Sequence, residues 1–348
     1  FNEVDKPELL MLGMLLHDIG KAKGHGHVAK GIPLIRELTA RMGLPPEDAG
    51  MVEFLVAHHL TMSHIAQRRD IDDPKTVETF AQTVGDPQRL RMLYLLTFAA
   101  RLWETLGGDV PMTDVRAHLA MVQDRYLAIT SVQRMAAHLR LAARLASTPV
   151  ATELFHHPDL GSSDLVVVTH DVPGLFSLIA GTLAAHGINI ISAQIATRAD
   201  GVAIDTFQVN DPTGEAVTSA AQWGRALAAL AAVLTEDQSV DALLERRRAG
   251  GRVTPPGETK PKITVDNRLS DEYTVIEVKC PDRLGLLYLI TRTLSGLDLD
   301  IASARIATEI DQAVDTFYVL DRKGRRLEDP AAIEQARTAL EQALLQPI

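Results

Sequence analysis

Cysteine, aromatic residues and long apolar runs are all scarce in this chain of 348 residues. The single cysteine, Cys280, cannot form a disulfide within the chain, which favours a reducing compartment such as the cytoplasm. Aromatic residues make up 4% of the sequence while Ala and Leu abound, so helices are expected more than a β-sandwich. The longest apolar run, residues 9–16, is too short to span a bilayer, and no signal peptide is expected.

Basic residues are also too few to suggest a nucleic-acid partner. The formal net charge is −10, whereas binding to phosphates requires a basic surface. Hydrophobic residues make up 46% of the chain, which is enough for two or three domains with cores of their own. The sequence begins at Phe1 without a methionine, and we interpret it as a piece of a longer protein that starts inside a domain.

The first 146 residues have apolar residues at helical spacing and no convincing β pattern. Prolines at 45–46, 74 and 87 mark loops or helix starts. We predict an all-α domain over residues 1–130, followed by a helical connector over 131–160. The expected helices cover residues 8–16, 32–42, 49–57, 76–83, 89–102, 115–127 and 131–146.

The second half contains one structural unit twice, about 111 residues apart. Each copy has a β-branched run, an Asp and Gly turn, an apolar helix and a hairpin. Three segments correspond between the first and the second copy: DVPGLFSLIAGTL and DRLGLLYLITRTL, ISAQIAT and ASARIAT, and DTFQV and DTFYV. We predict two α+β domains of ferredoxin-like βαββαβ order at 161–267 and 270–348. The first includes a linker at 246–262, and residues 262–267 are expected to supply its fourth strand.

The turn before the first helix of each repeat is a candidate ligand site. Gly174 and Gly285 allow a tight turn that leaves the helix N-terminus open to a carboxylate. Asp171 and Asp282 could accept from the ammonium group of a ligand, or could simply cap the helix.

These motifs resemble ACT domains, which are amino-acid-sensing modules that pair side by side. The resemblance implies a ligand near the first turn, at an interface formed within the chain or between chains. Leu284 and Asp298 depart from the first repeat, which has Pro173 and Gly187 there. The residues that the resemblance implicates are Asp171, Pro173, Gly174, Leu175 and Asn189 in the first repeat, and Asp282, Gly285 and Leu286 in the second.

A cluster of His and Asp in the first domain predicts a divalent metal site. The apolar run at residues 9–16 is followed directly by the sequence HDIGK at residues 17–21. His17 and Asp18 are therefore expected at the end of a buried helix. A buried carboxylate there requires compensation, which a cation provides. Further histidines follow at His25, His27, His58 and His59, although either of the last two could be an ordinary half-buried histidine.

Imidazole and carboxylate ligands suit a divalent ion, here Mg²⁺ or Mn²⁺, that assists hydrolysis of a phosphate ester. The predicted metal ligands are His17, Asp18, His27 and His58. The predicted catalytic residues are His17, Asp18, Lys21, His58 and His59, with Lys21 adding positive charge beside the phosphate.

The all-α domain with its HDIGK motif resembles an HD domain, which is a metal-dependent phosphohydrolase domain. An HD domain followed by two ACT repeats resembles the bifunctional PII uridylyltransferase/uridylyl-removing family. The segments AHHLTMSHIAQRRDIDDPKTV and RMLYLLT carry the resemblance. It implies that the HD domain hydrolyses UMP-tyrosine on the PII signal protein, and that glutamine at the ACT domains controls this reaction. The family's nucleotidyltransferase domain is absent from this sequence.

One departure from the family keeps other readings open. The family has an Asp shortly after LLT, where this chain has Ala100; Asp109 and Asp114 are candidate substitutes. Loss of that carboxylate would favour a glutamine sensor with an impaired hydrolase. A third reading is a (p)ppGpp-type HD hydrolase with ACT domains, which the tandem repeats and the QRRDIDDP stretch fit poorly.

Overall fold

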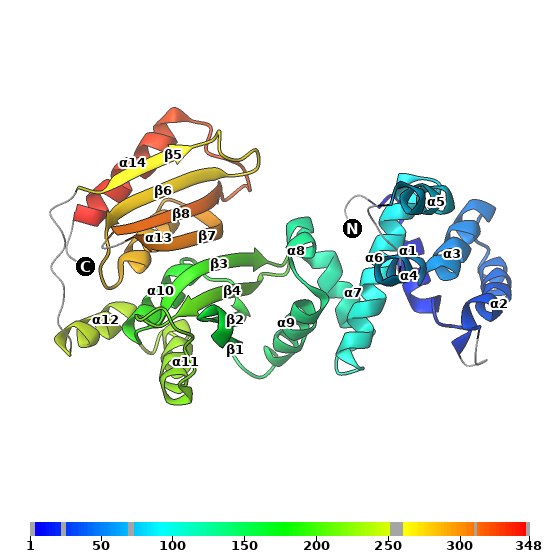
Figure 1. The fold of residues 1–348 in the computed structure, drawn as a ribbon, viewed down its shortest axis with the longest axis horizontal. Coiled ribbons are helices and arrows are strands. Elements are labelled where there is room, and N and C mark those ends of the chain that lie inside the picture. The colour runs from blue at the N-terminus through cyan, green and yellow to red at the C-terminus, as the bar shows by residue number, and fades with distance from the viewer. Residues whose placement is uncertain (1–3, 22–25, 69–72, 251–259, 310–311, 346–348) are drawn as a thin grey trace. The chain divides into compact units, whose positions relative to one another are not determined.

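The computed structural model describes the chain except for residues 1–3, 22–25, 69–72, 251–259, 310–311 and 346–348. It divides into two compact units, Phe1–Arg140 and Leu141–Ile348. The first unit is helical and the second is built on one antiparallel sheet (Figure 1). This confirms the predicted fold class, an all-α domain followed by two α+β domains. Residues 22–25 contain His25, which therefore lies outside the described residues, as do 251–259 of the predicted linker and 69–72 of the QRRDIDDP stretch.

Proline and aspartate set the starts of several helices in the first unit. Proline occupies the first turn of α1, α3, α5 and α6, where its missing N–H costs no hydrogen bond. Asp73 and Asp86 cap α5 and α6 by accepting from backbone N–H groups. The helices are α1 (Pro7–Leu16), α2 (His27–Arg41), α3 (Pro46–His58), α4 (Thr61–Arg68), α5 (Pro74–Val84), α6 (Pro87–Leu106), α7 (Met112–Met121), α8 (Asp124–Ile129) and α9 (Val132–Arg144).

Helix α6 carries the core of this unit, with Leu93, Leu96 and Leu102 fully buried. Contacts of α6 with α1 and α3 hold together the two helices whose ends carry the HDIGK motif and His58-His59. The prediction of one helix over 115–127 is wrong, because Val122 and Gln123 have extended backbone that separates α7 from α8. Helix α4 was not predicted.

The second unit contains two repeats. The first repeat consists of β1 (Val150–His157), β2 (Ser162–His170), α10 (Leu175–Ala185), β3 (Asn189–Thr197), β4 (Val202–Asn210), α11 (Ala220–Leu234) and α12 (Val240–Ala249), with a 3-10 turn, η2 (Pro158–Leu160), after β1. The second repeat consists of β5 (Lys262–Asp266), β6 (Thr274–Pro281), α13 (Leu286–Gly296), β7 (Leu299–Glu309), β8 (Gln312–Asp321) and α14 (Pro330–Leu345).

The two repeats share one eight-stranded sheet with the order β1-β2-β4-β3-β7-β8-β6-β5 (Figure 1). Strands β3 and β7 join the repeats by antiparallel pairing, with Ala193 opposite Ala304. Helices α10 and α13 contact each other, and one hydrophobic core runs through both repeats. The repeats therefore form a side-by-side pair within this chain.

Two expectations about the edge strands are wrong. Residues 262–266 form β5, which pairs with β6 of the second repeat and does not complete the first. The first repeat is completed by β1, which pairs with β2 inside the predicted helical connector at 131–160, where the helix ends at Arg144. Each repeat thus has the order ββαββα and not βαββαβ, because the fourth strand comes from the residues before the repeat.

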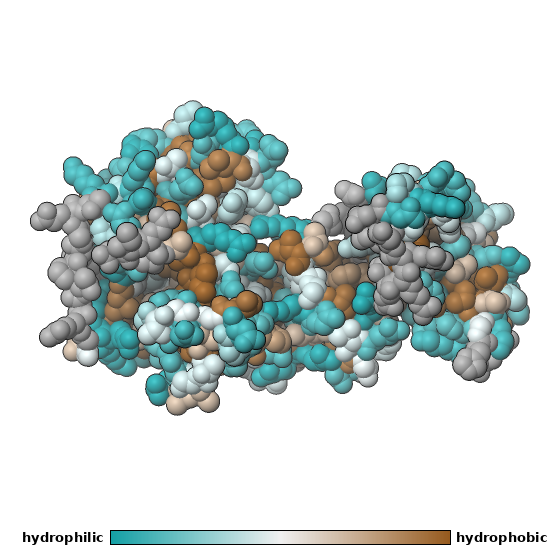
Figure 2. Space-filling model, viewed as in Figure 1, coloured by the Kyte–Doolittle hydropathy of each residue, from teal (hydrophilic) through white to brown (hydrophobic). Residues whose placement is uncertain are grey.

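No helix among the described residues is long and apolar enough to cross a membrane. On the face seen in Figure 2, hydrophilic residues cover most of the surface and hydrophobic residues show as separate small patches.

Candidate functional site

Asp18 lies in a turn at the end of the buried helix α1. The turn is closed by hydrogen bonds from the Ile19 N–H to the Leu16 carbonyl (3.0 Å) and from the Lys21 N–H to the Asp18 carbonyl (2.8 Å). Leu10 and Met14 anchor α1 in the core. The turn therefore holds the Asp18 carboxylate in a fixed place at the edge of the helical core.

Gly20 lets the next helix approach this turn. A Cβ atom on Gly20 would lie 2.0 Å from the carbonyl oxygen of His27, which is far inside contact distance. His27 is the first residue of α2, and its preceding residue, Gly26, has a left-handed backbone with φ of 75°. The glycine of HDIGK is thus needed to place His27 beside Asp18.

His59 reaches the same place from the end of α3. Its Nδ1–H donates to the Val56 carbonyl at 2.8 Å, which leaves the Nε2 lone pair facing Asp18. The Thr97 hydroxyl on α6 donates to the His59 carbonyl at 3.3 Å, so α6 fixes the backbone of His59 as well.

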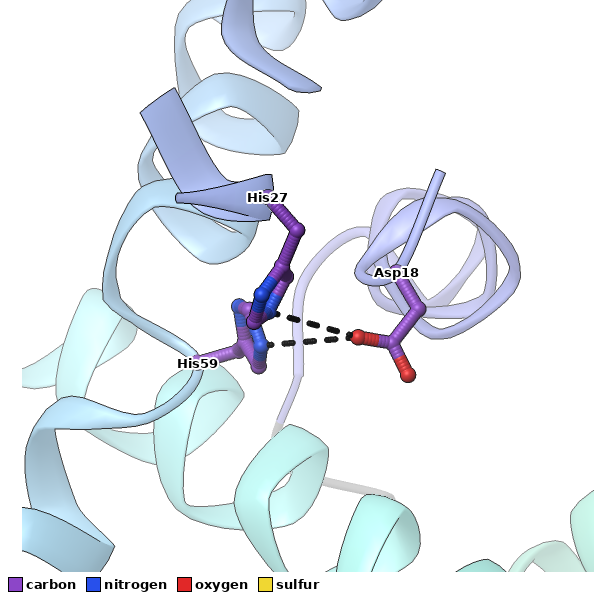
Figure 3. A group of neighbouring side chains, drawn as sticks. All are labelled: Asp18, His27 and His59. Carbon is purple, nitrogen blue, oxygen red and sulfur yellow. Dashed lines mark ion pairs between the residues drawn. The ribbon is translucent and has the colours of Figure 1, made fainter. Parts of the chain in front are cut away.

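The side chains of His27 and His59 converge on one oxygen of Asp18 (Figure 3). Their Nε2 atoms lie 3.6 and 3.9 Å from Asp18 Oδ1, and one ligand atom from each of the three residues lies within 4.8 Å of the others. Both Nε2 atoms are buried without a hydrogen-bond partner. Ligands of a divalent ion at ~2.1 Å would be separated by roughly 3.4 Å, so small shifts would let one ion satisfy all three groups.

Electrostatics favour the forms of Asp18 and His59 that bind a cation. Burial raises the pKa of Asp18, but the Lys21 hydrogen bond and His17 outweigh it, so its pKa is lowered overall. Burial lowers the pKa of His59, which favours the neutral imidazole. The ionised carboxylate and neutral imidazole fit the donor set of a divalent transition metal or Mg²⁺.

His17 and Lys21, both predicted as catalytic, lie beside this group. His17 Nδ1 donates to the Met14 carbonyl at 2.8 Å, and its Nε2 lies 3.1 Å from Asp18 Oδ2. Lys21 Nζ lies 2.6 Å from the same oxygen. The rings of His17 and His59 are 5.3 Å apart. His17 therefore extends the cluster, while Asp18, His27 and His59 provide its converging atoms.

His58, predicted as a metal ligand, is not brought into the cluster. Its ring packs at 4.8 Å from the Phe54 ring, and its Nδ1 is 3.4 Å from the Thr61 hydroxyl. Burial and the neighbouring Arg89 lower its pKa. Of the adjacent pair, the structure turns His59 toward Asp18, whereas the sequence predicted His58 as the metal ligand and His59 only as a catalytic residue.

Neither candidate substitute for the missing acid at Ala100 lies in the cluster. Ala100 is one turn after Thr97 on α6 and so shares its face. Asp109 accepts from Arg140 Nε at 3.1 Å, and Asp114 accepts from the Thr113 hydroxyl. Among the described residues, the site has one carboxylate where the family pattern expects two.

A second site is a cavity of about 580 Å³ between the two repeats. Four of the eight predicted ligand residues line it: Asn189, Asp282, Gly285 and Leu286. Gly285, with φ of 80°, is the N-cap of α13, and no side chain caps that helix. Asp282 is therefore not the cap, which was the alternative to a ligand role.

The other four predicted residues, Asp171, Pro173, Gly174 and Leu175, lie outside this cavity at the corresponding turn of the first repeat. There the partner across the interface is Asp300, which occupies the position of Asn189 in the second repeat. Burial and then Asp300 raise the pKa of Asp171. The turn of the second repeat thus shares its cavity with the amide of Asn189, whereas the turn of the first repeat lies near the carboxylate of Asp300.

Asp298, noted as a departure in sequence, keeps the conformation of its counterpart Gly187. Their φ angles are 60° and 69°, and Asp is among the few side chains that tolerate this region. Sequence reasoning also missed Arg247 and Asp315, which line the cavity. The repeated DTF sequence was the available signal for Asp315.

Family models agree with this division. The model described as HD domain matches residues 2–129, the ACT domain model matches 163–222, and a model described as ACR9-like, ACT-like domain matches 262–348.

Curated relatives match along nearly the whole chain. Bifunctional uridylyltransferase/uridylyl-removing enzymes of Gluconobacter oxydans and Rhodospirillum rubrum are each 34% identical, over 95% and 100% of the chain. The enzyme of that name from Azospirillum brasilense is 31% identical over 97%. The chain spans only 40–42% of the length of these relatives. It consists of an HD domain followed by two ACT-type domains, and it is a homologue of the bifunctional uridylyltransferase/uridylyl-removing enzymes.

Proposed function

We propose that this chain is a metal-dependent phosphodiesterase that removes UMP from a tyrosine of the PII signal protein, under the control of glutamine bound between its ACT domains. The observation that carries the proposal is the convergence of His27 Nε2 and His59 Nε2 on Asp18, with both nitrogens buried and unpartnered. The names of the relatives favour uridylyl removal over a (p)ppGpp-type hydrolysis.

Asp18, His27 and His59 would hold the divalent ion, Mg²⁺ or Mn²⁺. When bound, the ion supplies Lewis acidity to a water molecule and to the phosphate. His17 and Lys21 both contact Asp18 Oδ2, so they orient the carboxylate and place positive charge at the edge of the site. His59 is held in its ligand tautomer by the Val56 carbonyl.

A sensor with an impaired hydrolase is the second candidate, and Ala100 favours it. This position shares the face of α6 that contacts His59, and it carries no donor atom. A site that lacks one anionic ligand binds a divalent ion more weakly. The cavity between the ACT domains would then be the functional site, and it would act on a partner domain through conformational coupling.

Release of UMP from uridylylated PII decides between the two. With Mn²⁺ present, the chain should release UMP, and Asp18→Asn and His59→Ala should each abolish it. His58→Ala is the matched control, because it removes the adjacent imidazole outside the cluster. Equal, negligible release from the wild type and the Asp18 variant would leave only the sensor. An increase in release with glutamine would support control through the ACT domains.

A further inference from the structure

Asp315 is an acid in the apolar face of β8. Strand alternation places it in a row with Ala313, Phe317 and Val319, and all four side chains are buried. Asp315 is 1% exposed. Burial of an ionised carboxylate in such a row is costly unless a positive group compensates it. The packing of the second ACT domain therefore does not explain why an acid stands here.

The carboxyl of Asp315 is only partly satisfied. It accepts from the backbone N–H of Ala307 on the neighbouring strand β7. Its other oxygen, Oδ1, is buried without a hydrogen-bond partner. Asp315 also lines the cavity between the two ACT domains. An unpartnered carboxylate oxygen is thus buried in the wall of a cavity large enough for a small molecule, where a small rotation of the side chain would bring it to a ligand.

The same cavity also contains a group that favours an anion. The N-terminus of α13 opens on it at Gly285 and Leu286, and no side chain caps that terminus. Backbone N–H groups and the helix dipole favour a carboxylate there. The side chains of Asp282 and Asp315 line the cavity as well. A helix N-terminus suited to a carboxylate and a buried acid suited to a cation, both in the lining of one cavity, match the two charges of a free amino acid.

We propose that Asp315 binds the α-ammonium group of the amino acid held in this cavity, and so makes the site selective for amines. This inference rests on the proposed role of the ACT domains as an effector site. Burial and then Asp282 raise the pKa of Asp315 to about 7. The carboxyl therefore has an accessible ionised form near neutral pH, which a neighbouring ammonium group would stabilise.

Asp205 provides a matched control within the chain. It is the equivalent Asp of the first repeat, it is also 1% exposed, and its Oδ1 is likewise unpartnered. Unlike Asp315, it is not among the residues that line this cavity. A purely structural role for the buried Asp would make both positions behave alike, whereas a ligand role separates them.

Calorimetric titration of the whole chain tests the proposal. The probes are glutamine and glutaramate, which is glutamine without its α-amino group. Wild-type protein should bind glutamine at least tenfold more tightly than glutaramate, about 1.4 kcal/mol. Asp315→Asn should weaken glutamine at least tenfold and leave glutaramate unchanged, whereas Asp205→Asn should change neither.

The outcomes distinguish a failure of the role proposed for Asp315 from a failure of the proposed effector site. Equal affinity of the wild type for both probes would overturn the role of Asp315 without any variant, so a folding defect in Asp315→Asn cannot obscure the answer. Glutamine binding that is unchanged in a folded Asp315→Asn protein would overturn the assignment and leave the effector site standing. Absence of binding by the wild type to glutamine and to the other amino acids would overturn the effector site as well.

Discussion

Asp205 and Asp315 hold the same position in the two ACT domains, each buried on the core face of its strand and each with one unpartnered oxygen. Burial raises the pKa of both carboxyls, to about 7 for Asp315. Asp315 also lines the cavity between the domains, and Asp205 is not among the residues that line it. Both repeats thus contain a buried acid that is costly to ionise. Asp315 is the one that lies where a cationic ligand would compensate its charge.

Replacement of Asp315 by Asn should stabilise the fold above neutral pH. An unfolded Asp ionises near its ordinary pKa of 3.8, whereas Asp315 stays protonated in the fold to about pH 7. Stability should therefore fall as pH rises from about 4 to 7 in the wild type. At about 1.4 kcal/mol per pKa unit, the variant gains at most about 4 kcal/mol above pH 7.

Calorimetric unfolding at pH 4 and pH 8 measures this effect. The Tm difference between variant and wild type should be larger at pH 8 than at pH 4. Asp205→Asn should behave in the same way, because its carboxyl is equally buried. A Tm that drops at pH 8 in both variants would mean that the acids stabilise the fold.

Gly285→Ala should weaken glutamine binding, with Gly174→Ala as its control. Both glycines are N-caps with left-handed backbone, at φ of 80° and 75°. Alanine in that conformation costs about 1–2 kcal/mol of stability in either place. Because only Gly285 lines the cavity, only its variant should lose affinity in a calorimetric titration. Equal losses in both would indicate a general effect of destabilisation.

His27→Ala and His59→Ala should each abolish stable uptake of Mn²⁺. Each removes one of three converging ligand atoms. His58→Ala should retain the metal, since that ring packs on Phe54. Elemental analysis after dialysis against Mn²⁺ gives the metal content directly. Loss of metal in the His58 variant alone would restore the assignment expected from sequence.

Gly20→Ala should remove the metal without touching a ligand. The added methyl would lie 2.0 Å from the His27 carbonyl oxygen, so α2 would have to move away from Asp18. Gly50→Ala on α3 is the control, because nothing lies within 4 Å of its added Cβ. Far-UV circular dichroism should show both variants folded. Full metal content in the Gly20 variant would contradict the close approach.

Ala100→Asp should strengthen metal binding and any hydrolase activity. The position follows Thr97 by one helical turn on the face of α6 that contacts His59. A carboxylate at this position would offer the metal a second anionic ligand, and we expect about a tenfold increase in Mn²⁺ affinity. A titration of Mn²⁺ followed by electron paramagnetic resonance measures it. Unchanged affinity would place Ala100 too far from the metal.

The order of helices and strands was largely predictable because it depends on local patterns. The helical spacing at residues 9–16 and the repeated turns at Gly174 and Gly285 were enough to locate α1, α10 and α13. Edge strands were less predictable, because β1 and β5 acquire their partners only by pairing with β2 and β6. Nothing local in residues 262–266 says which repeat they join.

By itself, the sequence determined the two kinds of domain. HDIGK with its histidines indicated a metal site, and the Asp and Gly turns indicated a ligand site. Only the tertiary structure decided which of these residues lie close to one another. His59 and not His58 faces Asp18, because adjacent side chains leave the end of α3 in different directions. Asp282 and Asn189 line the same cavity, whereas Asp171 lies close enough to Asp300 for that carboxylate to raise its pKa, because the pairing of β3 with β7 sets which residues face each other across the interface.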